Sequence, residues 1–240
     1  MTRLVSIFLF LLGLGGIACT SYRVNVQGVE LDRLFASSSG QEDGDVGRAE
    51  GHNDRGVVLE RTGDLRGALA EYRQAVRLDP SLSQAWINMG NVWVKLEENN
   101  EAIKCYRQAL KHEPEHPHAL NNLAWVLLET GGDPQQASLL LERALAADPE
   151  HRFLYLDSLG WASFLRGQPT EAVTILREAV KKTPLEMSRL RGDALFHLGQ
   201  ALLSLERREE AEKALEESLA ADHSKQRREQ VEKLLNGDGS

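Results

Sequence analysis

The sequence predicts an all-α fold, an α-solenoid of five repeated helix pairs closed by one further helix. Small and apolar residues recur with a period of 34 positions, and glycine and proline residues recur between the apolar segments. Within those segments, bulky apolar residues follow the i, i+3, i+4 spacing of amphipathic helices. The chain has 240 residues, of which 42% are hydrophobic and 27% charged, as is usual for a globular protein.

The first twenty residues, MTRLVSIFLFLLGLGGIACT, differ in composition from the rest of the chain. Arg3 precedes an uncharged apolar run, which is shorter than the roughly 20 apolar residues of a membrane-spanning helix. Small residues then lead to Cys19, and the arrangement resembles a bacterial lipoprotein signal, although Gly16 stands where leucine is typical. We therefore expect a signal peptide over 1–18 and a lipid on Cys19. An ordinary secretory signal and an uncleaved anchor are the alternatives.

Residues 19–47 are expected to form the lipidated N-terminus and a flexible tether. The second half of this segment is small, acidic and glycine-containing, a composition that buries too little apolar surface to order itself. Its first half contains VNVQGVELDRLF, residues 24–35, which is apolar enough to dock on the array. Thr20 follows the cysteine where an aspartate would resemble an inner-membrane retention signal. The periplasmic face of the outer membrane is therefore the expected location, with a secreted or periplasmic protein as the alternative.

The repeat itself is visible as columns of residues. In the first two copies, Gly56, Ala68, Tyr72, Ala75 and Pro80 recur 34 positions later as Gly90, Ala102, Tyr106, Ala109 and Pro114. The later copies carry Ala124, Ala137, Leu141, Ala144 and Pro149; then Gly160, Ala172, Leu176, Ala179 and Pro184; then Gly199, Ala211, Leu215 and Ser218. We number positions so that Gly56 and its equivalents are position 8.

These columns resemble the tetratricopeptide repeat family, in which each unit is a helix, a turn and a second helix. The expected units are 48–80, 83–114, 117–149, 153–184 and 192–223, which together make an array over 48–223. The small residue at position 8 lets the second helix approach closely. Gly63, Gly131 and Gly167 mark the turns, where a left-handed residue ends the first helix at little steric cost. Asp79-Pro80 and Asp148-Pro149 end second helices.

Two departures from the period affect the C-terminal part of the array. About five extra residues within LEMSRLRGDA lengthen the start of the fifth unit. Residues 224–236 follow the last unit and read as an amphipathic helix with Val231, Leu234 and Leu235 on its inner side. A repeat array needs a terminal cap with a polar outer face, and this segment is the expected cap.

The resemblance implies that the first helices line a concave groove, with positions 2, 5, 9 and 12 facing it. Trp125 and Trp161 both fall at position 9. An apolar patch with polar neighbours is typical of a binding site, and tryptophan is enriched among binding hot spots. The predicted groove residues are Ile87, Asn91, Val94, Asn121, Trp125, Leu128, Asp157, Trp161 and Phe164.

Two alternatives remain open for this stripe. The residues are buried between repeats, or the groove is filled by the chain itself, with residues 24–35 as the occupant. A clamp for a C-terminal carboxylate is not expected. Asn91 and Asn122 match the asparagine positions of such clamps, but Ile87, Leu154 and Ser158 stand where the clamp has lysine and arginine.

No constellation of residues indicates catalysis. Phosphate loops, nucleophile elbows and metal-binding helix motifs are missing from the sequence, so we expect no enzyme, no cofactor and no small-molecule substrate. The formal net charge of −8 disfavours nucleic acid as a partner. His112, His116 and His118 cluster in a proline-containing loop without a fixed scaffold, and Cys105 is read as a packing residue.

The expected function is that of a membrane-anchored interaction scaffold that binds a peptide or helix of another envelope protein. In layout the chain resembles envelope lipoproteins with tetratricopeptide repeats, such as the pilotins of type IV pili, so assembly of a pilus, secretion or export complex is the expected setting. A purely structural subunit with a self-filled groove and an accessory that positions an envelope hydrolase are the alternatives.

Overall fold

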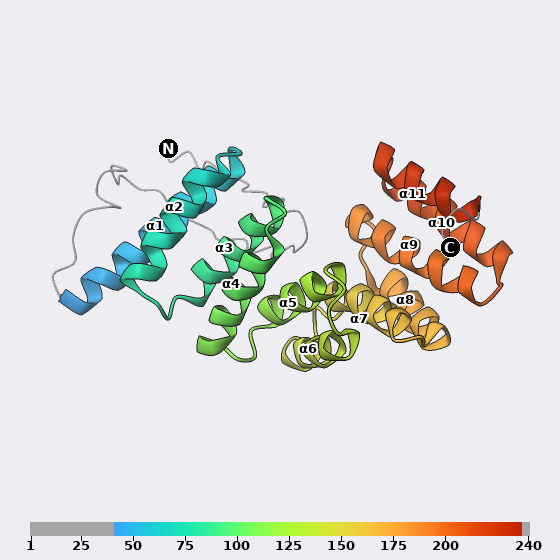
Figure 1. The fold of residues 1–240 in the computed structure, drawn as a ribbon, viewed down its shortest axis with the longest axis horizontal. Coiled ribbons are helices and arrows are strands. Elements are labelled where there is room, and N and C mark those ends of the chain that lie inside the picture. The colour runs from blue at the N-terminus through green and yellow to red at the C-terminus, as the bar shows by residue number, and fades with distance from the viewer. Residues whose placement is uncertain (1–40, 237–240) are drawn as a thin grey trace, which may run out of the picture. The chain divides into compact units, whose positions relative to one another are not determined.

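The computed structural model describes residues 41–236, and within that range the chain forms eleven helices and no strand (Figure 1). The predicted signal peptide, Cys19 and residues 24–35 lie outside the described residues. The chain divides into two compact units, one ending at His112 and the other beginning at Glu113. The predicted all-α class is confirmed.

The first unit contains two helix pairs. Its helices are α1 (Gln41–Arg61), α2 (Leu65–Leu78), α3 (Ser83–Lys95) and α4 (Asn99–His112). Each first helix packs on its own second helix, and α3 also contacts α1 and α2. The first helix is longer than predicted. Residues 41–47, expected to be part of the tether, are helical, because extending an existing helix costs far less than starting one.

The second unit contains three helix pairs and the terminal helix. Its helices are α5 (Pro117–Glu129), α6 (Pro134–Ala147), α7 (Phe153–Leu165), α8 (Pro169–Lys182), α9 (Ser188–Ser204), α10 (Arg208–Ala221) and α11 (Lys225–Leu235). Figure 1 shows α5 with α6, α7 with α8 and α9 with α10 as successive hairpins. The first helices of successive repeats also contact each other, α5 with α7 and α7 with α9.

The glycine at position 8 permits the close approach within the first, second, fourth and fifth pairs. A Cβ atom built on Gly56 would lie 2.5 Å from a ring carbon of Tyr72, and one on Gly90 would lie 2.6 Å from Tyr106. Leucine takes the tyrosine's place in the fourth and fifth repeats, where the corresponding distance is 2.5 Å at Gly160 and 2.6 Å at Gly199. The predicted close approach is confirmed, and the side chain that fills the space is the bulky residue 16 positions later.

The inter-helix turns follow the predicted chemistry with two exceptions. Gly63, Gly131 and Gly167 have φ of 86°, 70° and 75°, in the left-handed region that glycine adopts readily. In the second and fifth repeats, Glu97 and Glu206 take this conformation, with φ of 61° and 60°. A side chain in this region is strained, so these two turns are less favourable than the three glycine turns.

The C-terminal part also matches its prediction. Helix α9 has 17 residues against 13 in α3, α5 and α7, which accommodates the extra residues of the fifth unit. Helix α11 begins after Ser224, whose hydroxyl accepts a hydrogen bond from the backbone N–H of Arg227. Val231 is 2% exposed and packs with Phe196 and Leu215. The helix therefore covers the end of the array.

Two tryptophans pack in the first unit, and so does the thiol that was predicted to be a packing residue. Trp86 and Trp93 lie against the core cluster, and the Trp86 indole N–H donates to the Pro80 carbonyl at 2.9 Å. The Arg73 guanidinium lies 5.4 Å from the Trp93 ring centre. Cys105 is buried, and burial raises the pKa of its thiol to about 12. It is a small core residue and not a reactive thiol.

Candidate functional site

The candidate site is the face of the second unit formed by positions 2, 5, 6, 9 and 12 of α5, α7 and α9, together with Arg227 of α11. We call it the inner face. It contains the two tryptophans at position 9, Trp125 on α5 and Trp161 on α7. Because α5 contacts α7 and α7 contacts α9, equivalent positions of successive first helices are neighbours. The side chains can therefore be compared repeat by repeat.

In the fourth repeat, the inner face is filled by aromatic rings from two helices. The Trp161 and Phe164 rings are stacked, 5.1 Å apart between centres and 17° from parallel. The His197 imidazole, at position 6 of the fifth repeat, stacks on Trp161 at 4.7 Å and 18°. The predicted residues Asp157, Trp161 and Phe164 are thus brought together, and His197 of the next helix completes the cluster.

His197 is held in this place by an ion pair. Its Nδ1 lies 2.8 Å from Oδ1 of Asp157, and both side chains are mostly buried. Burial lowers the pKa of His197, but the charge of Asp157 and its hydrogen bond outweigh this effect, so the pKa is raised overall. Asp193 also raises the pKa of His197, whereas Arg227 lowers it. The imidazole is therefore predisposed to carry a proton.

The fifth repeat is closed in a similar way by the terminal helix. Arg227 is 8% exposed, its guanidinium lies 4.3 Å from the centre of the Phe196 ring, and it forms an ion pair with Asp193. Its Nε also lies 3.6 Å from a carboxylate oxygen of Asp222. Burial raises the pKa of Asp193, and so does the nearby Asp157, whereas Arg227 and His197 lower it. The pair fixes α11 on the inner face.

The third repeat differs, because its tryptophan is open. Trp125 is 40% exposed, more than any other Phe, Trp or Tyr in the part of the chain that the structure describes. Asn121, four residues earlier on α5, donates from Nδ2 to Oδ1 of Asn122 at 3.3 Å. The Asn121 Oδ1 atom is enclosed and accepts no hydrogen bond from any described residue. An exposed ring and an unsatisfied amide oxygen thus lie one helical turn apart.

Two of the predicted site residues belong to the core. Ile87 is 3% exposed and Leu128 is 5% exposed, so neither offers surface to a partner. Both are aliphatic, and burying such a side chain gains about 1.5–3 kcal/mol relative to leaving it exposed. The expectation that they face a partner is corrected on this ground.

The other predicted residues of the first unit are partly buried. Asn91 accepts a hydrogen bond from the Tyr106 hydroxyl at 2.8 Å, and Val94 is half-buried. The same tyrosine position in the first repeat, Tyr72, donates to Glu60, which also binds Lys95 at 2.6 Å. In both repeats the polar groups of the first helix hold the second helix, which is a structural use of these side chains.

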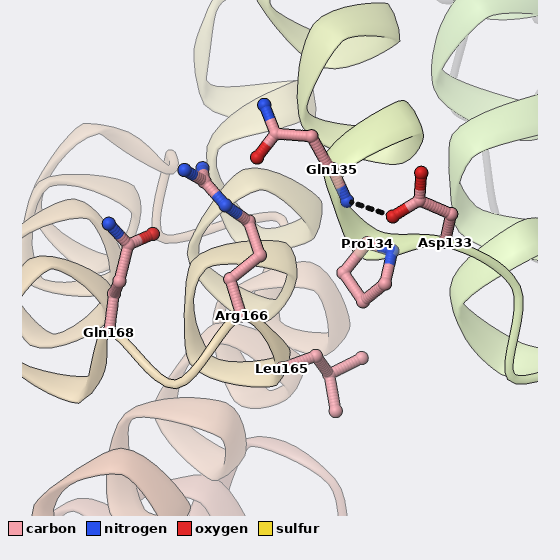
Figure 2. Close-up of a pocket in the computed structure, with 6 residues that line it drawn as sticks. All are labelled: Asp133, Pro134, Gln135, Leu165, Arg166 and Gln168. Carbon is pink, nitrogen blue, oxygen red and sulfur yellow. Dashed lines mark hydrogen bonds between the residues drawn. The ribbon is translucent and has the colours of Figure 1, made fainter.

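A separate shallow cavity of about 460 Å³ lies at the turns of the third and fourth repeats (Figure 2). Asp133 caps α6 there, accepting from the Gln135 backbone N–H at 2.9 Å, and Arg166 donates to the Ser138 hydroxyl at 3.3 Å. Its lining residues are Asp133, Pro134, Gln135, Leu165, Arg166 and Gln168. None of them belongs to the predicted stripe, and the two charged ones are engaged in structural hydrogen bonds.

Two further searches concern other kinds of site. Within residues 41–236, histidine, cysteine and carboxylate side chains form no group of three that would hold a metal ion. His116 accepts a hydrogen bond at the start of α5, where its Nδ1 lies 3.3 Å from the Ala119 nitrogen, so it acts as a helix cap. In the same range no helix has the length and apolar content needed to cross a membrane.

Comparison with known proteins identifies the repeat. Two family models described as tetratricopeptide repeat match residues 49–82 and 87–151. A third, described as anaphase-promoting complex, cyclosome, subunit 3, matches residues 130–218. Residues 49–82 and 87–151 thus match the tetratricopeptide repeat in sequence, and the helix pairs have its fold. The residues that resemble this family in sequence thus form its fold, and the chain has the architecture of a tetratricopeptide-type scaffold for protein–protein interaction.

Similar proteins share these repeats over part of their length. The chain is similar to tetratricopeptide repeat protein 6 of Homo sapiens, with 34% identity over 76 residues, 32% of this chain and 15% of the human protein. The first three curated relatives are matched over only 13–15% of their own lengths.

Solved structures give longer matches at lower identity. One is YrrB, described as a TPR protein with an unusual peptide-binding site, at 24% identity and a TM-score of 0.57, covering 76% of this chain and 90% of that one. Another is PilW, described as a widely conserved type IV pilus biogenesis factor, at 21% identity and a TM-score of 0.65, covering 73% and 78%. At these identities, the likeness establishes the shared fold.

Proposed function

We propose that the second unit binds a peptide or helical segment of another protein on its inner face, with Trp125 as the anchor. The observation that carries this proposal is the 40% exposure of Trp125 at a position where the next repeat covers its tryptophan. Exposed tryptophan among polar groups is typical of protein-binding surfaces. YrrB, which shares the fold, is described as having a peptide-binding site.

The neighbouring residues have distinct roles in this proposal. Asn121 contacts the backbone or a side chain of the bound segment, since an amide both donates and accepts. Asp157, Trp161 and Phe164 form the adjoining wall of the site, which His197 stabilises. In the first unit, Asn91 and Val94 stay predicted groove residues of that unit. We assign no catalytic role and no small-molecule substrate to the chain.

We further propose that a lipid on Cys19 holds the protein at the periplasmic face of an outer membrane. The basis is the sequence of residues 1–20, with Ala18 before the cysteine and Thr20 after it. PilW, which shares the fold, is described as a type IV pilus biogenesis factor, and this supports a role in assembling a pilus, secretion or export complex. Several acyl chains on one residue would anchor the protein far better than a single chain.

The lipid is tested by metabolic labelling with radioactive palmitate. The wild-type protein is expected to take up label, and Cys19→Ser is expected to remain unlabelled. Equal labelling of the two proteins would refute the anchor at this residue. Cys105→Ser is the matched control, because its thiol is buried and its loss should leave the labelling unchanged.

The binding face is tested by a crosslinking pull-down from membranes. Trp125→Ala is compared with Leu139→Ala, which removes a side chain that is 53% exposed on α6. We expect the first change to abolish the crosslinked partner and the second to leave it intact, with both proteins folded by circular dichroism. An unchanged partner with Trp125→Ala would refute the inner face as the site.

One observation favours the alternative of a self-filled groove. His197 already covers Trp161 from within the chain, so part of the inner face is closed by the protein itself. If residues 24–35 close the remainder, deleting residues 21–40 should increase partner binding, since α1 begins at Gln41 and is left intact. If they do not, the deletion leaves the affinity unchanged.

A further inference from the structure

Three aromatic side chains of the inner face have surroundings that can be compared directly. They are Trp125, Trp161 and Phe196, one from each first helix of the second unit. Two of them are covered by a nitrogen-bearing side chain, which comes from α9 for Trp161 and from α11 for Phe196. His197 stacks on Trp161 while paired with Asp157, and Arg227 lies over Phe196 while paired with Asp193. In each case an aromatic face and a carboxylate acceptor hold one planar nitrogen-bearing group.

The register of the repeats explains why Trp125 lacks such a cover. His197 stands at position 6 of the fifth repeat and meets positions 5 and 9 of the fourth, Asp157 and Trp161. The corresponding residues one repeat earlier are Ser158 at position 6, Asn121 at position 5 and Trp125 at position 9. Serine is too short to reach across an indole ring. The third repeat therefore has the acceptor, Asn121, and the tryptophan, Trp125, but the fourth repeat supplies no side chain that covers the ring.

The state of Asn121 and Trp125 agrees with this comparison. Asn121 has an amide oxygen that accepts no hydrogen bond from the described residues, where Asp157 accepts one from His197. Trp125 is 40% exposed. Both the acceptor and the ring thus lack the partner that their counterparts possess, as expected of a place left for a side chain from outside.

Charge indicates which side chain fits. Residues 113–236 carry 21 Asp and Glu against 15 Lys and Arg, so the unit attracts cations. Guanidinium stacks on aromatic rings and donates several hydrogen bonds in one plane, as Arg227 does on Phe196 in this protein.

We propose that Trp125, Asn121 and Ser158 form a slot that takes an arginine side chain of the bound peptide, with its guanidinium over the indole ring and an N–H donated to the Asn121 amide oxygen. The oxygen is enclosed in this structure, so the amide turns toward the slot on binding. The inference rests on the proposed peptide-binding function and names the side chain that the partner must present.

The test selects peptides on the purified full-length protein. Random heptapeptides displayed on phage are panned on the wild type, and the best peptide is synthesised with arginine or with citrulline, its uncharged isostere. We expect arginine to be enriched at one position and citrulline to weaken binding about tenfold, through loss of the cation–π contact and the charge. Enrichment of other residues at that position, with binding still dependent on Trp125, would overturn the arginine slot and leave the proposed function standing.

Variants test the geometry with the same peptide. Ser158→His supplies the missing ring from within the chain and is expected to abolish binding, as is Trp125→Leu. Leu139→Ala, which removes an exposed side chain on α6 away from the inner face, is the matched control and should leave binding unchanged. Full binding by folded Ser158→His would refute the slot. If Ser158→His does not fold, the loss of binding in Trp125→Leu and with the citrulline peptide tests the slot instead. Absence of any Trp125-dependent peptide would overturn both the slot and the proposed function.

Discussion

The contact between Gly56 and Tyr72 provides a sharp test of the packing account, through the substitution Gly56→Ala. A Cβ atom at position 56 would lie 2.5 Å and 2.7 Å from two ring carbons of Tyr72, far inside the usual carbon–carbon separation of about 3.5–4.0 Å. Tyr72 is fully buried and its hydroxyl donates to Glu60 at 2.8 Å, so the ring cannot easily move away. The new methyl group must push the two helices apart.

The expected magnitude is the balance of two effects. Overfilling a packed core costs about 1–3 kcal/mol, whereas replacing glycine by alanine inside a helix gains about 0.5–1 kcal/mol. Gly56→Ala should therefore lower the free energy of unfolding by about 0–2.5 kcal/mol. Gly51→Ala lies on the same helix, and its nearest atom is Nη1 of Arg55 at 3.7 Å. This control variant gains the higher helix propensity of alanine without a clash, and it should stabilise the protein by about 0.5–1 kcal/mol.

Urea unfolding followed by circular dichroism measures both free energies. The double variant Gly56→Ala/Tyr72→Leu adds a further check, because the third repeat already pairs Ala124 with Leu141 at these positions. We expect the double variant to be more stable than the sum of the single changes predicts. If Gly56→Ala stabilises the protein as much as Gly51→Ala, the reasoning about position 8 is wrong.

Two further predictions concern a turn and a titration. Glu97 and Glu206 have a left-handed backbone conformation with φ of 61° and 60°, so Glu97→Gly and Glu206→Gly should each stabilise the protein by about 0.5–1 kcal/mol in the same assay. Gly63→Ala places a side chain in this conformation and should destabilise the protein. A loss of stability in both glycine variants would contradict this reasoning. Burial lowers the pKa of His197, but Asp157 raises it by more, so the pKa is higher in the folded protein than in the unfolded chain. The ion pair of His197 therefore stabilises the protein fully below the unfolded pKa of about 6.5, and this stabilisation is lost as the pH rises through the folded pKa. The difference in unfolding free energy between wild type and His197→Gln should shrink over that interval, and a difference that grows with pH would refute the ion pair.

Local sequence signals were sufficient for much of the fold. The recurrence of small residues at position 8 predicted the close helix pairs, and glycine predicted three of the left-handed turns. Both signals depend on steric limits that act within one repeat. The helical state of residues 41–47 was not predicted, because their acidic, glycine-containing composition opposes a helix that the adjoining residues extend.

The site was harder to predict, because side-chain exposure depends on the neighbouring repeat. Position 12 carries both Leu128, which is buried, and Phe164, which is only partly buried and stacks on Trp161. The side chain that covers Trp161, His197, stands at position 6 of the next repeat. Comparing positions within one repeat at a time therefore does not reveal it. Aligning position 9 of each repeat with position 6 of the following one would have found His197.

Site-specific photocrosslinking tests the central claim, partner binding at Trp125 on the inner face, most directly. Benzoylphenylalanine is placed at position 125 in one protein and at position 139, an exposed site on α6, in the other, and both are irradiated in membranes. We expect a discrete protein adduct from position 125, competed by the selected peptide, and none from position 139. An adduct from position 139 alone, or equal adducts from both positions, would contradict the claim.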